Sequence, residues 1–220
     1  MKILFLGDIV GRSGRSAVIN NLPTIIKTNK IDFSIVNAEN ATSGMGLSVK
    51  HAKEILEIGA DCITLGDHAF DQKDMLQFIE TEHRILRPLN FSKSAPGKGS
   101  NIYADKRGRK ILVSQILGQV FMKRPFDDPF SEIDGILSKN ILGGLVQASL
   151  VDIHCEATSE KMAFGILVFY STLFPEVVAR AARCEKSLSK VVARMQACSQ
   201  NQPHSRTELY VFDQGASKSR

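Results

Sequence analysis

The sequence is poor in cysteine and has no long apolar run. Its four cysteines form no CxxC pair, which argues against a disulfide-stapled scaffold. Cys62 and Cys155 lie in or beside apolar runs, as the reduced thiols of cytosolic proteins do. No stretch approaches the roughly 18 consecutive apolar residues that a membrane span needs, and the first apolar run ends at Asp8, too early for a signal peptide. We therefore expect a soluble, cytoplasmic protein with no membrane partner.

The chain has little net charge outside its last quarter. The formal charge is +5, but residues 166–220 contain eight Lys or Arg and four Asp or Glu. That leaves 20 of the 28 basic and 19 of the 23 acidic residues for positions 1–165. A nearly neutral body gives no support to a broad surface for duplex DNA or RNA. Nucleic-acid binding by the basic end of the chain stays open, as does assembly into a homo-oligomer.

Internal repeats and the common phosphate-loop motifs are also missing. Gly7, Gly11 and Gly14 are spaced neither as GxGxxG nor as GxxxxGK[ST]. A nucleotide-binding loop is therefore not expected near the amino terminus.

Strand-like and helix-like patterns alternate over the first 65 residues. Strand-like runs occupy 2–7, 33–36 and 62–65, and the segments between them carry apolar residues three and four apart, at 18–26 and 52–58. This order predicts parallel strands joined by right-handed crossovers. The expected fold class is α/β, with a layered sheet.

The pattern changes after residue 100. Two strand-like runs flank Lys106–Lys110, which indicates a hairpin whose antiparallel strands join the same sheet. Residues 130–140 are expected to be helical, and 148–153 to form a buried, central strand.

From Ile166 onward the composition shifts again, so we expect a domain over 1–165 and a divergent appendage over 166–220. Positions 177–195 have the spacing of a basic amphipathic helix. The polar stretch 200–220 is expected to be loosely ordered.

Polar clusters follow the apolar runs at four places: Gly7-Asp8, Asn37-Ala38-Glu39-Asn40, Gly66-Asp67-His68 and His154-Cys155-Glu156. In an open α/β sheet, ligands bind outside the carboxyl ends of the strands, so we expect these clusters to converge although they lie far apart in the chain. Carboxylate, amide and imidazole groups are ligands of iron, manganese and zinc. The four clusters together therefore predict a metal centre.

Each cluster taken alone has a simpler interpretation. Asp8 is equally explained as a cap of the following turn, Glu39 and Asn40 as loop hydrogen-bonding groups, and His154 as a buried histidine bonded to the backbone. For Asp67 and His68 the pairing suggests that one binds metal and the other transfers a proton. The coincidence at four separate strand ends favours the joint interpretation. Surface roles are expected for the other histidines: His51, His83 and His204.

Six segments carry a resemblance to a known family: Gly7-Asp8-Ile9-Val10-Gly11, Asn37-Ala38-Glu39-Asn40, Gly66-Asp67-His68, Arg87-Pro88-Leu89-Asn90-Phe91, Asp127-Asp128-Pro129-Phe130 and His154-Cys155-Glu156-Ala157-Thr158-Ser159-Glu160-Lys161. In order and spacing the set closely resembles the YmdB-like bacterial metallophosphoesterases, a branch of the calcineurin-like superfamily. The resemblance covers about residues 1–165 and marks this part as a metallophosphoesterase domain.

The resemblance implies a four-layered α/β sandwich that holds two metal ions, with iron as the first choice and manganese as the alternative. It also implies hydrolysis of small phosphodiesters, with 2′,3′-cyclic nucleotides as the substrate class. The ligands it implies are Asp8, Glu39 and Asn40 for the first ion, and Glu39, Asp67 and His154 for the second. His68 corresponds to the proton donor.

The sequence departs from the family pattern twice. Position 67 is Asp where the family has Asn, which keeps an oxygen ligand and adds negative charge. Beyond Gly165 the family continues to a Gly-Thr-His-Thr-His motif that supplies one histidine to each ion, and the 220 residues contain no such motif. The domain is thus expected to be incomplete at its C-terminal end and its hydrolysis impaired. The alternative is a non-catalytic scaffold whose basic helix at 177–195 binds RNA, an acidic partner or a membrane surface.

Overall fold

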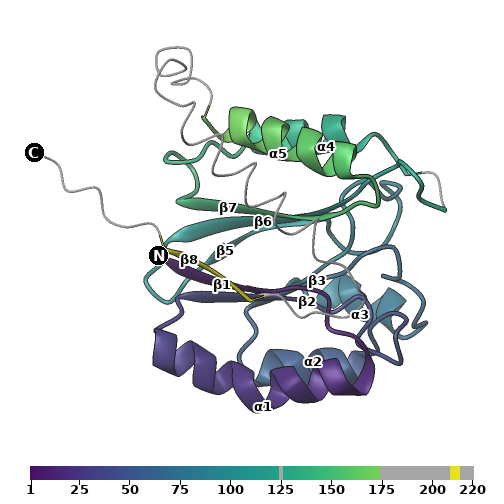
Figure 1. The fold of residues 1–220 in the computed structure, drawn as a ribbon, viewed down its shortest axis with the longest axis vertical. Coiled ribbons are helices and arrows are strands. Elements are labelled where there is room, and N and C mark those ends of the chain that lie inside the picture. The colour runs from purple at the N-terminus through teal and green to yellow at the C-terminus, as the bar shows by residue number, and fades with distance from the viewer. Residues whose placement is uncertain (124–125, 174–208, 214–220) are drawn as a thin grey trace, which may run out of the picture.

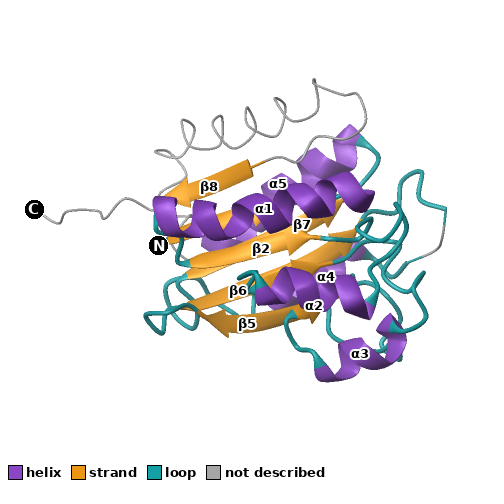
Figure 2. Ribbon diagram, turned by 90° about the horizontal axis from the view of Figure 1, so that it is seen from below, coloured by secondary structure: helices purple, strands orange, loops and turns teal. Residues whose placement is uncertain are grey.

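The computed structural model describes residues 1–123, 126–173 and 209–213, which form two stacked sheets with helices on both outer faces (Figure 1). The first sheet has the order β4-β3-β2-β1-β8. Its strands are β1 (Lys2–Leu6), β2 (Phe33–Asn37), β3 (Cys62–Thr64), β4 (Ile85–Leu86) and β8 (Leu209–Asp213). Helices α1 (Gly11–Asn29) and α2 (Val49–Glu57) cover its outer face, and α3 (Met75–Thr81) lies beside them (Figures 1 and 2).

The second sheet has the order β5-β6-β7. It contains β5 (Ser100–Ala104), β6 (Lys110–Leu117) and β7 (Ala148–His154), with α4 (Pro129–Leu137) and α5 (Thr158–Leu173) on its outer face (Figure 1). The fold is therefore an α/β sandwich of four layers, helix, sheet, sheet and helix, as the family resemblance implied.

Strands β1 to β4 are parallel, and α1 and α2 connect the first three of them. All five residues of β2 are buried, because one side of this strand faces the helices and the other faces the second sheet. Its Val36 packs in the helix-facing core, whereas Phe33 and Ile35 pack with Ile111 and Val113 of β6 between the sheets. The apolar character of the sequence run at 33–36 follows from this double burial.

Three helix ends have local causes in the neighbouring residues. The Ser48 hydroxyl accepts a hydrogen bond from the backbone N–H of His51 and caps α2, and Asp128 caps α4 at Phe130 in the same way. Helix α1 ends at Asn29, and its C-cap residue Lys30 has a left-handed backbone with φ of 53°.

Three expectations about the strands are wrong. Strands β5 and β6 form the expected hairpin but lie in a second sheet, because an alternating pattern fixes which face is buried and not which sheet is joined. Strand β7 ends the order of the described second sheet and is not central. Within the stretch expected to be loosely ordered, Leu209–Asp213 forms β8 and pairs antiparallel with β1, which agrees with the strand propensity of its β-branched and aromatic residues.

Several expectations fall on parts of the chain outside the described residues, among them the basic helix at 177–195 and His204. The division of the chain at residue 165 stays a prediction. Among the described residues, none of the helices has the length and apolar character that crossing a bilayer requires.

We predict that Phe164→Ala destabilises the protein by about 3–5 kcal/mol, because Phe164 is fully buried and stacks on Phe130 at a ring distance of 4.2 Å, joining α5 to α4. Urea unfolding measures the change. The matched control is Phe121→Ala, whose side chain is 83% exposed, and for which we expect a change within about 0.5 kcal/mol. Equal effects of the two substitutions would contradict the assigned packing.

Candidate metal centre

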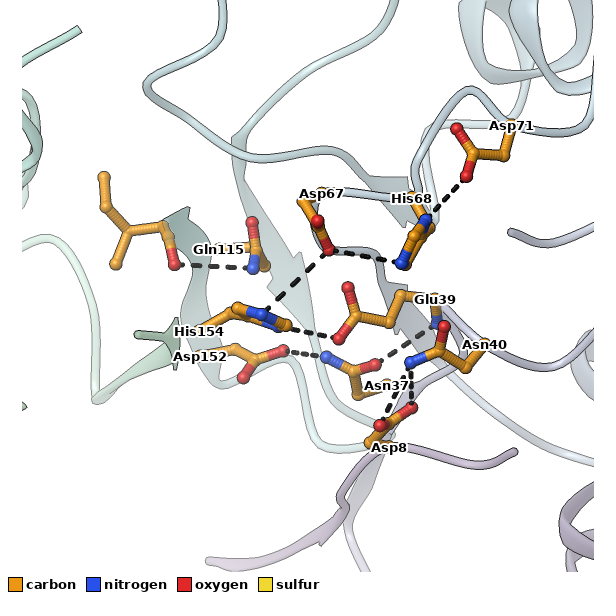
Figure 3. Close-up of polar contacts among 11 residues, drawn as sticks. Asp8, Asn37, Glu39, Asn40, Asp67, His68, Asp71, Gln115, Asp152 and His154 are labelled. Atoms are coloured by element: carbon orange, nitrogen blue, oxygen red, sulfur yellow. Dashed lines mark hydrogen bonds and ion pairs between the residues drawn. The ribbon is translucent and has the colours of Figure 1, made fainter. Parts of the chain in front are cut away.

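Four strands deliver polar side chains to one edge of the sandwich (Figure 3). Asp8 follows β1, Glu39 follows β2 and Asp67 follows β3, each within three residues of the strand end, while His154 is the last residue of β7. The carboxyl ends of parallel strands share one edge, which is why residues far apart in the sequence meet here.

Glu39, Asp67 and His154 form the centre of this cluster. Each offers one ligand atom, and these three atoms lie within 4.8 Å of one another. The Nδ1 atom of His154 lies 2.7 Å from Oε1 of Glu39, and its Nε2 lies 4.0 Å from Oδ1 of Asp67. Two carboxylates and an imidazole at such distances are a suitable donor set for a divalent transition metal ion.

The surroundings of Glu39 fit a bound cation. Glu39 is 1% exposed, and its Oε2 atom is buried with no hydrogen-bond partner in the described part of the chain. A Cβ atom added at Gly66 would overlap this oxygen, so the glycine leaves the space that the carboxylate occupies. Because an unpaired buried carboxylate oxygen is costly, a cation at this point would remove a penalty.

Asp8 and Asn40 form a second pair beside Glu39 (Figure 3). The Nδ2 atom of Asn40 donates to both carboxylate oxygens of Asp8, at 3.0 and 3.1 Å. Burial raises the pKa of Asp8, and the hydrogen bond from Asn40 opposes that rise. Asparagine ligates metals through Oδ1, whereas the bond to Asp8 uses Nδ2, so the pairing is compatible with a ligand role for both residues.

His68 lies between two carboxylates. Its Nδ1 atom is 2.6 Å from Oδ2 of Asp71, and its Nε2 atom is 3.8 Å from Oδ1 of Asp67. The bond to Asp71 fixes the ring orientation and leaves Nε2 on the side of the cluster. Asp71 was not recognised in the sequence, although its position three residues after His68 in a turn is a usable signal.

The negative charge of the cluster acts on His154. Burial alone lowers the pKa of this imidazole, but the hydrogen bond and charge of Glu39, with Asp67 and Asp152, raise it to about 9. The same electrostatic field attracts a metal cation.

Below the cluster lies a buried bridge that sequence reasoning missed. The Oδ2 atom of Asp152, on β7, accepts hydrogen bonds from Nδ2 of Asn37 at 2.8 Å and from Oγ1 of Thr64 at 2.6 Å. Desolvation raises the pKa of Asp152, and these two hydrogen bonds oppose the shift. A polar residue inside an apolar strand run is the signal that could have drawn attention to Asp152.

The segment Arg87–Phe91 shapes the loops around the edge. Asn90 is fully buried; its Nδ2 donates to the carbonyl oxygens of Leu117 and Asp127, and its Oδ1 accepts from the backbone N–H of Leu117. Asn90 thereby joins Leu117, the last residue of β6, to Asp127 at the far end of the following loop. This loop begins next to His154, whose carbonyl oxygen accepts the backbone N–H of Gly118.

All six residues singled out in the sequence thus lie at one edge of the molecule. Their assignment as ligands and proton donor stays a prediction. Of the histidines expected on the surface, His83 is exposed and His51 is half-buried, with its Nδ1 2.8 Å from Oγ1 of Thr42 beside the N-terminal cap of α2.

Comparison with known proteins agrees with this architecture. The model of the YmdB-like protein family matches residues 4–169. The chain belongs to the YmdB-like family. It is 38% identical over 165 residues to a 2′,3′-cyclic-nucleotide 2′-phosphodiesterase of Bacillus subtilis (strain 168), covering 75% of this chain and 61% of the relative.

Two solved structures share the YmdB-like fold. One is a hypothetical protein from Thermus thermophilus, with a TM-score of 0.69 and 38% identity over 76% of this chain and 63% of that one. The other is a novel phosphatase from Mycoplasma pneumoniae, with a TM-score of 0.69 and 34% identity over 78% of this chain and 61% of that one. The names of these relatives make the family one of phosphoesterases. The chain spans about three fifths of the length of the relatives it matches.

We predict that Gly66→Ala weakens Mn²⁺ binding by about tenfold or more, because its Cβ would displace the carboxylate of Glu39. Titration followed by electron paramagnetic resonance of free Mn²⁺ measures the affinity. Gly135→Ala is the control, since a Cβ at that position meets nothing within 4 Å. Wild-type Mn²⁺ affinity in Gly66→Ala would argue against Glu39 as a ligand.

Proposed function

We propose that this chain is a metal-dependent phosphodiesterase that acts on small phosphodiesters such as 2′,3′-cyclic nucleotides. The observation that carries the proposal is the convergence of Glu39, Asp67 and His154, together with the buried Oε2 of Glu39, which has no hydrogen-bond partner among the described residues. The similarity to a 2′,3′-cyclic-nucleotide 2′-phosphodiesterase supports the substrate class. The name of the M. pneumoniae structure, a novel phosphatase, supports the broader assignment as a phosphohydrolase.

The residues that would hold two ions are Asp8, Glu39 and Asn40 for one, and Glu39, Asp67 and His154 for the other. When bound, two divalent ions activate water and neutralise the charge that develops on a phosphoryl group. Iron or manganese suits a site of carboxylate, amide and imidazole ligands. The two oxygens of Glu39 allow it to serve both positions, since Oε1 faces His154 while Oε2 has no other partner among the described residues.

His68 would hold the proton for the leaving oxygen at Nε2. Its Nδ1 is engaged by Asp71 at 2.6 Å, so Nε2 is the ring atom left to face the cluster. Asp71 keeps the ring in one orientation, which is the arrangement that general acid catalysis needs.

The chain's turnover is proposed to be slow. In the family pattern a Gly-Thr-His-Thr-His motif gives one further histidine to each ion, and the 220 residues contain no His-x-His. With fewer ligands, each ion would bind more weakly and its position would be less restrained. The cytoplasmic location is part of the same proposal and is supported by Cys62 and Cys155, which are free and buried.

The first test is hydrolysis of bis(p-nitrophenyl) phosphate and of 2′,3′-cyclic AMP with and without Mn²⁺. We expect Mn²⁺-dependent hydrolysis that EDTA abolishes, with a kcat/KM below that of the B. subtilis relative assayed in parallel, because this chain has the smaller set of ligands. Hydrolysis that is unaffected by EDTA would contradict the metal-dependent mechanism. A chain that binds Mn²⁺ but cleaves neither ester would favour the non-catalytic alternative.

We further predict that His68→Gln lowers kcat by about 10²–10⁴-fold while Mn²⁺ affinity stays near the wild-type value, because the substitution removes the proton donor and no predicted ligand. Steady-state kinetics with 2′,3′-cyclic AMP measures the effect. His83→Gln is the matched control, since His83 lies outside the cluster beside α3 and should leave kcat unchanged. A His68→Gln variant with unchanged kcat would remove His68 from the mechanism.

A further inference from the structure

The two sheets contribute unequally to the proposed centre. Asp8, Glu39, Asn40 and Asp67 follow strands of the first sheet, whereas His154 ends a strand of the second. The 2.7 Å contact between Glu39 and His154 therefore crosses from one sheet to the other. The sheets pack through apolar side chains, and apolar contacts have no preferred direction. A directional interaction is needed to keep His154 opposite Glu39.

Asp152 makes such an interaction. It lies two residues before His154, so both side chains project from the same face of β7. A single oxygen of Asp152 accepts the two hydrogen bonds from Asn37 and Thr64, at 2.8 and 2.6 Å. Because Asn37 ends β2 and Thr64 ends β3, this oxygen holds the ends of two strands of the first sheet against β7.

Asn37 extends the restraint to Glu39 (Figure 3). While its Nδ2 donates to Asp152, its Oδ1 accepts the backbone N–H of Glu39 at 3.2 Å. Thr64 lies three residues before Asp67 in the turn that follows β3. In the chain, Glu39 follows Asn37 by two residues and Asp67 follows Thr64 by three. His154 follows Asp152 itself by two residues. Each member of the central cluster is therefore close in the chain to this bridge.

We propose that Asp152 is a positioning residue of the metal centre, an inter-sheet bridge that sets His154 against Glu39. The inference deepens the proposed function and rests on it for the identity of Glu39 and His154 as ligands. A slip of either sheet would break both hydrogen bonds and leave buried polar groups unpaired, so the bridge admits one alignment of the sheets. Outer partners of this kind change metal affinity by about 10–100-fold when removed.

The test compares Asp152→Ala, Asp152→Asn and a control, Ser114→Ala. Ser114 is also fully buried in the second sheet, on β6, and its Oγ bonds that of Ser100 at 2.8 Å, so its removal costs a buried hydrogen bond away from the bridge. One readout is the ring ¹⁵N spectrum of His154 without metal, which reports the hydrogen bond at Nδ1. The other is the Mn²⁺ dissociation constant.

We expect Asp152→Ala to lose the hydrogen-bonded Nδ1 signal and to weaken Mn²⁺ binding by about 10–100-fold. Asp152→Asn keeps an acceptor for Asn37 and Thr64 and is expected to restore both readouts. Ser114→Ala is expected to leave the His154 ring spectrum and the Mn²⁺ dissociation constant unchanged, even if the substitution lowers the urea concentration at the midpoint of unfolding. Wild-type readouts in Asp152→Ala, or equal losses in Ser114→Ala, would overturn the proposal.

If Asp152→Ala does not fold, Thr64→Val provides a second test of the bridge. It removes one of the two donors at nearly constant volume, and we expect a smaller change of both readouts in the same direction. No change in Thr64→Val would overturn the bridge. The imidazole signal requires neither metal nor substrate, so an absence of hydrolysis or of Mn²⁺ binding in the wild-type chain would count against the proposed function and leave this inference to be decided by the spectrum.

Discussion

A buried carboxylate at the junction of two sheets is the constraint on which the rest of this structure depends. Glu39 is 1% exposed, and a carboxyl group removed from water to that degree requires compensating partners. One oxygen lies 2.7 Å from Nδ1 of His154; burial lowers the pKa of this histidine, but the contact with Glu39 and the charges of Asp67 and Asp152 raise it to about 9. The other oxygen has no partner in the described chain. An unpaired buried acceptor in a native protein needs an explanation, and a cation provides one.

The meeting of Asp8, Glu39 and Asp67 could be predicted from the sequence because it follows from the topology of one sheet. In a run of strand, helix and strand, the strands become parallel and their carboxyl ends share an edge. Asp8, Glu39 and Asp67 each come directly after such a strand, so no knowledge of the packing was needed to bring them together. His154 was found because it ends an apolar run, although its strand proved to lie in the other sheet.

What the sequence could not predict depends on pairings between distant residues. Asp152 is visible as a polar residue in an apolar strand, but its partners Asn37 and Thr64 lie 115 and 88 residues away and are chosen by how the two sheets stack. The same limit explains the misplacement of β5 and β6, since alternation along a strand carries no information on its neighbours. Strand β8 escaped notice because a five-residue run within a polar stretch is a weak signal.

The aspartate at position 67 bears on how the proposed centre would hold a cation. Its Oδ1 lies 3.8 Å from Nε2 of His68 and 4.0 Å from Nε2 of His154, between the two imidazoles. An asparagine there would offer one oxygen and no charge, whereas the aspartate offers an oxygen with a negative charge. In the proposed centre, this charge would add attraction for the cation but no coordination position beyond the one an asparagine oxygen offers. Charge acts on a cation without a preferred direction, so the aspartate would raise cation affinity in the proposed centre without supplying the rigid alignment that in-line displacement requires.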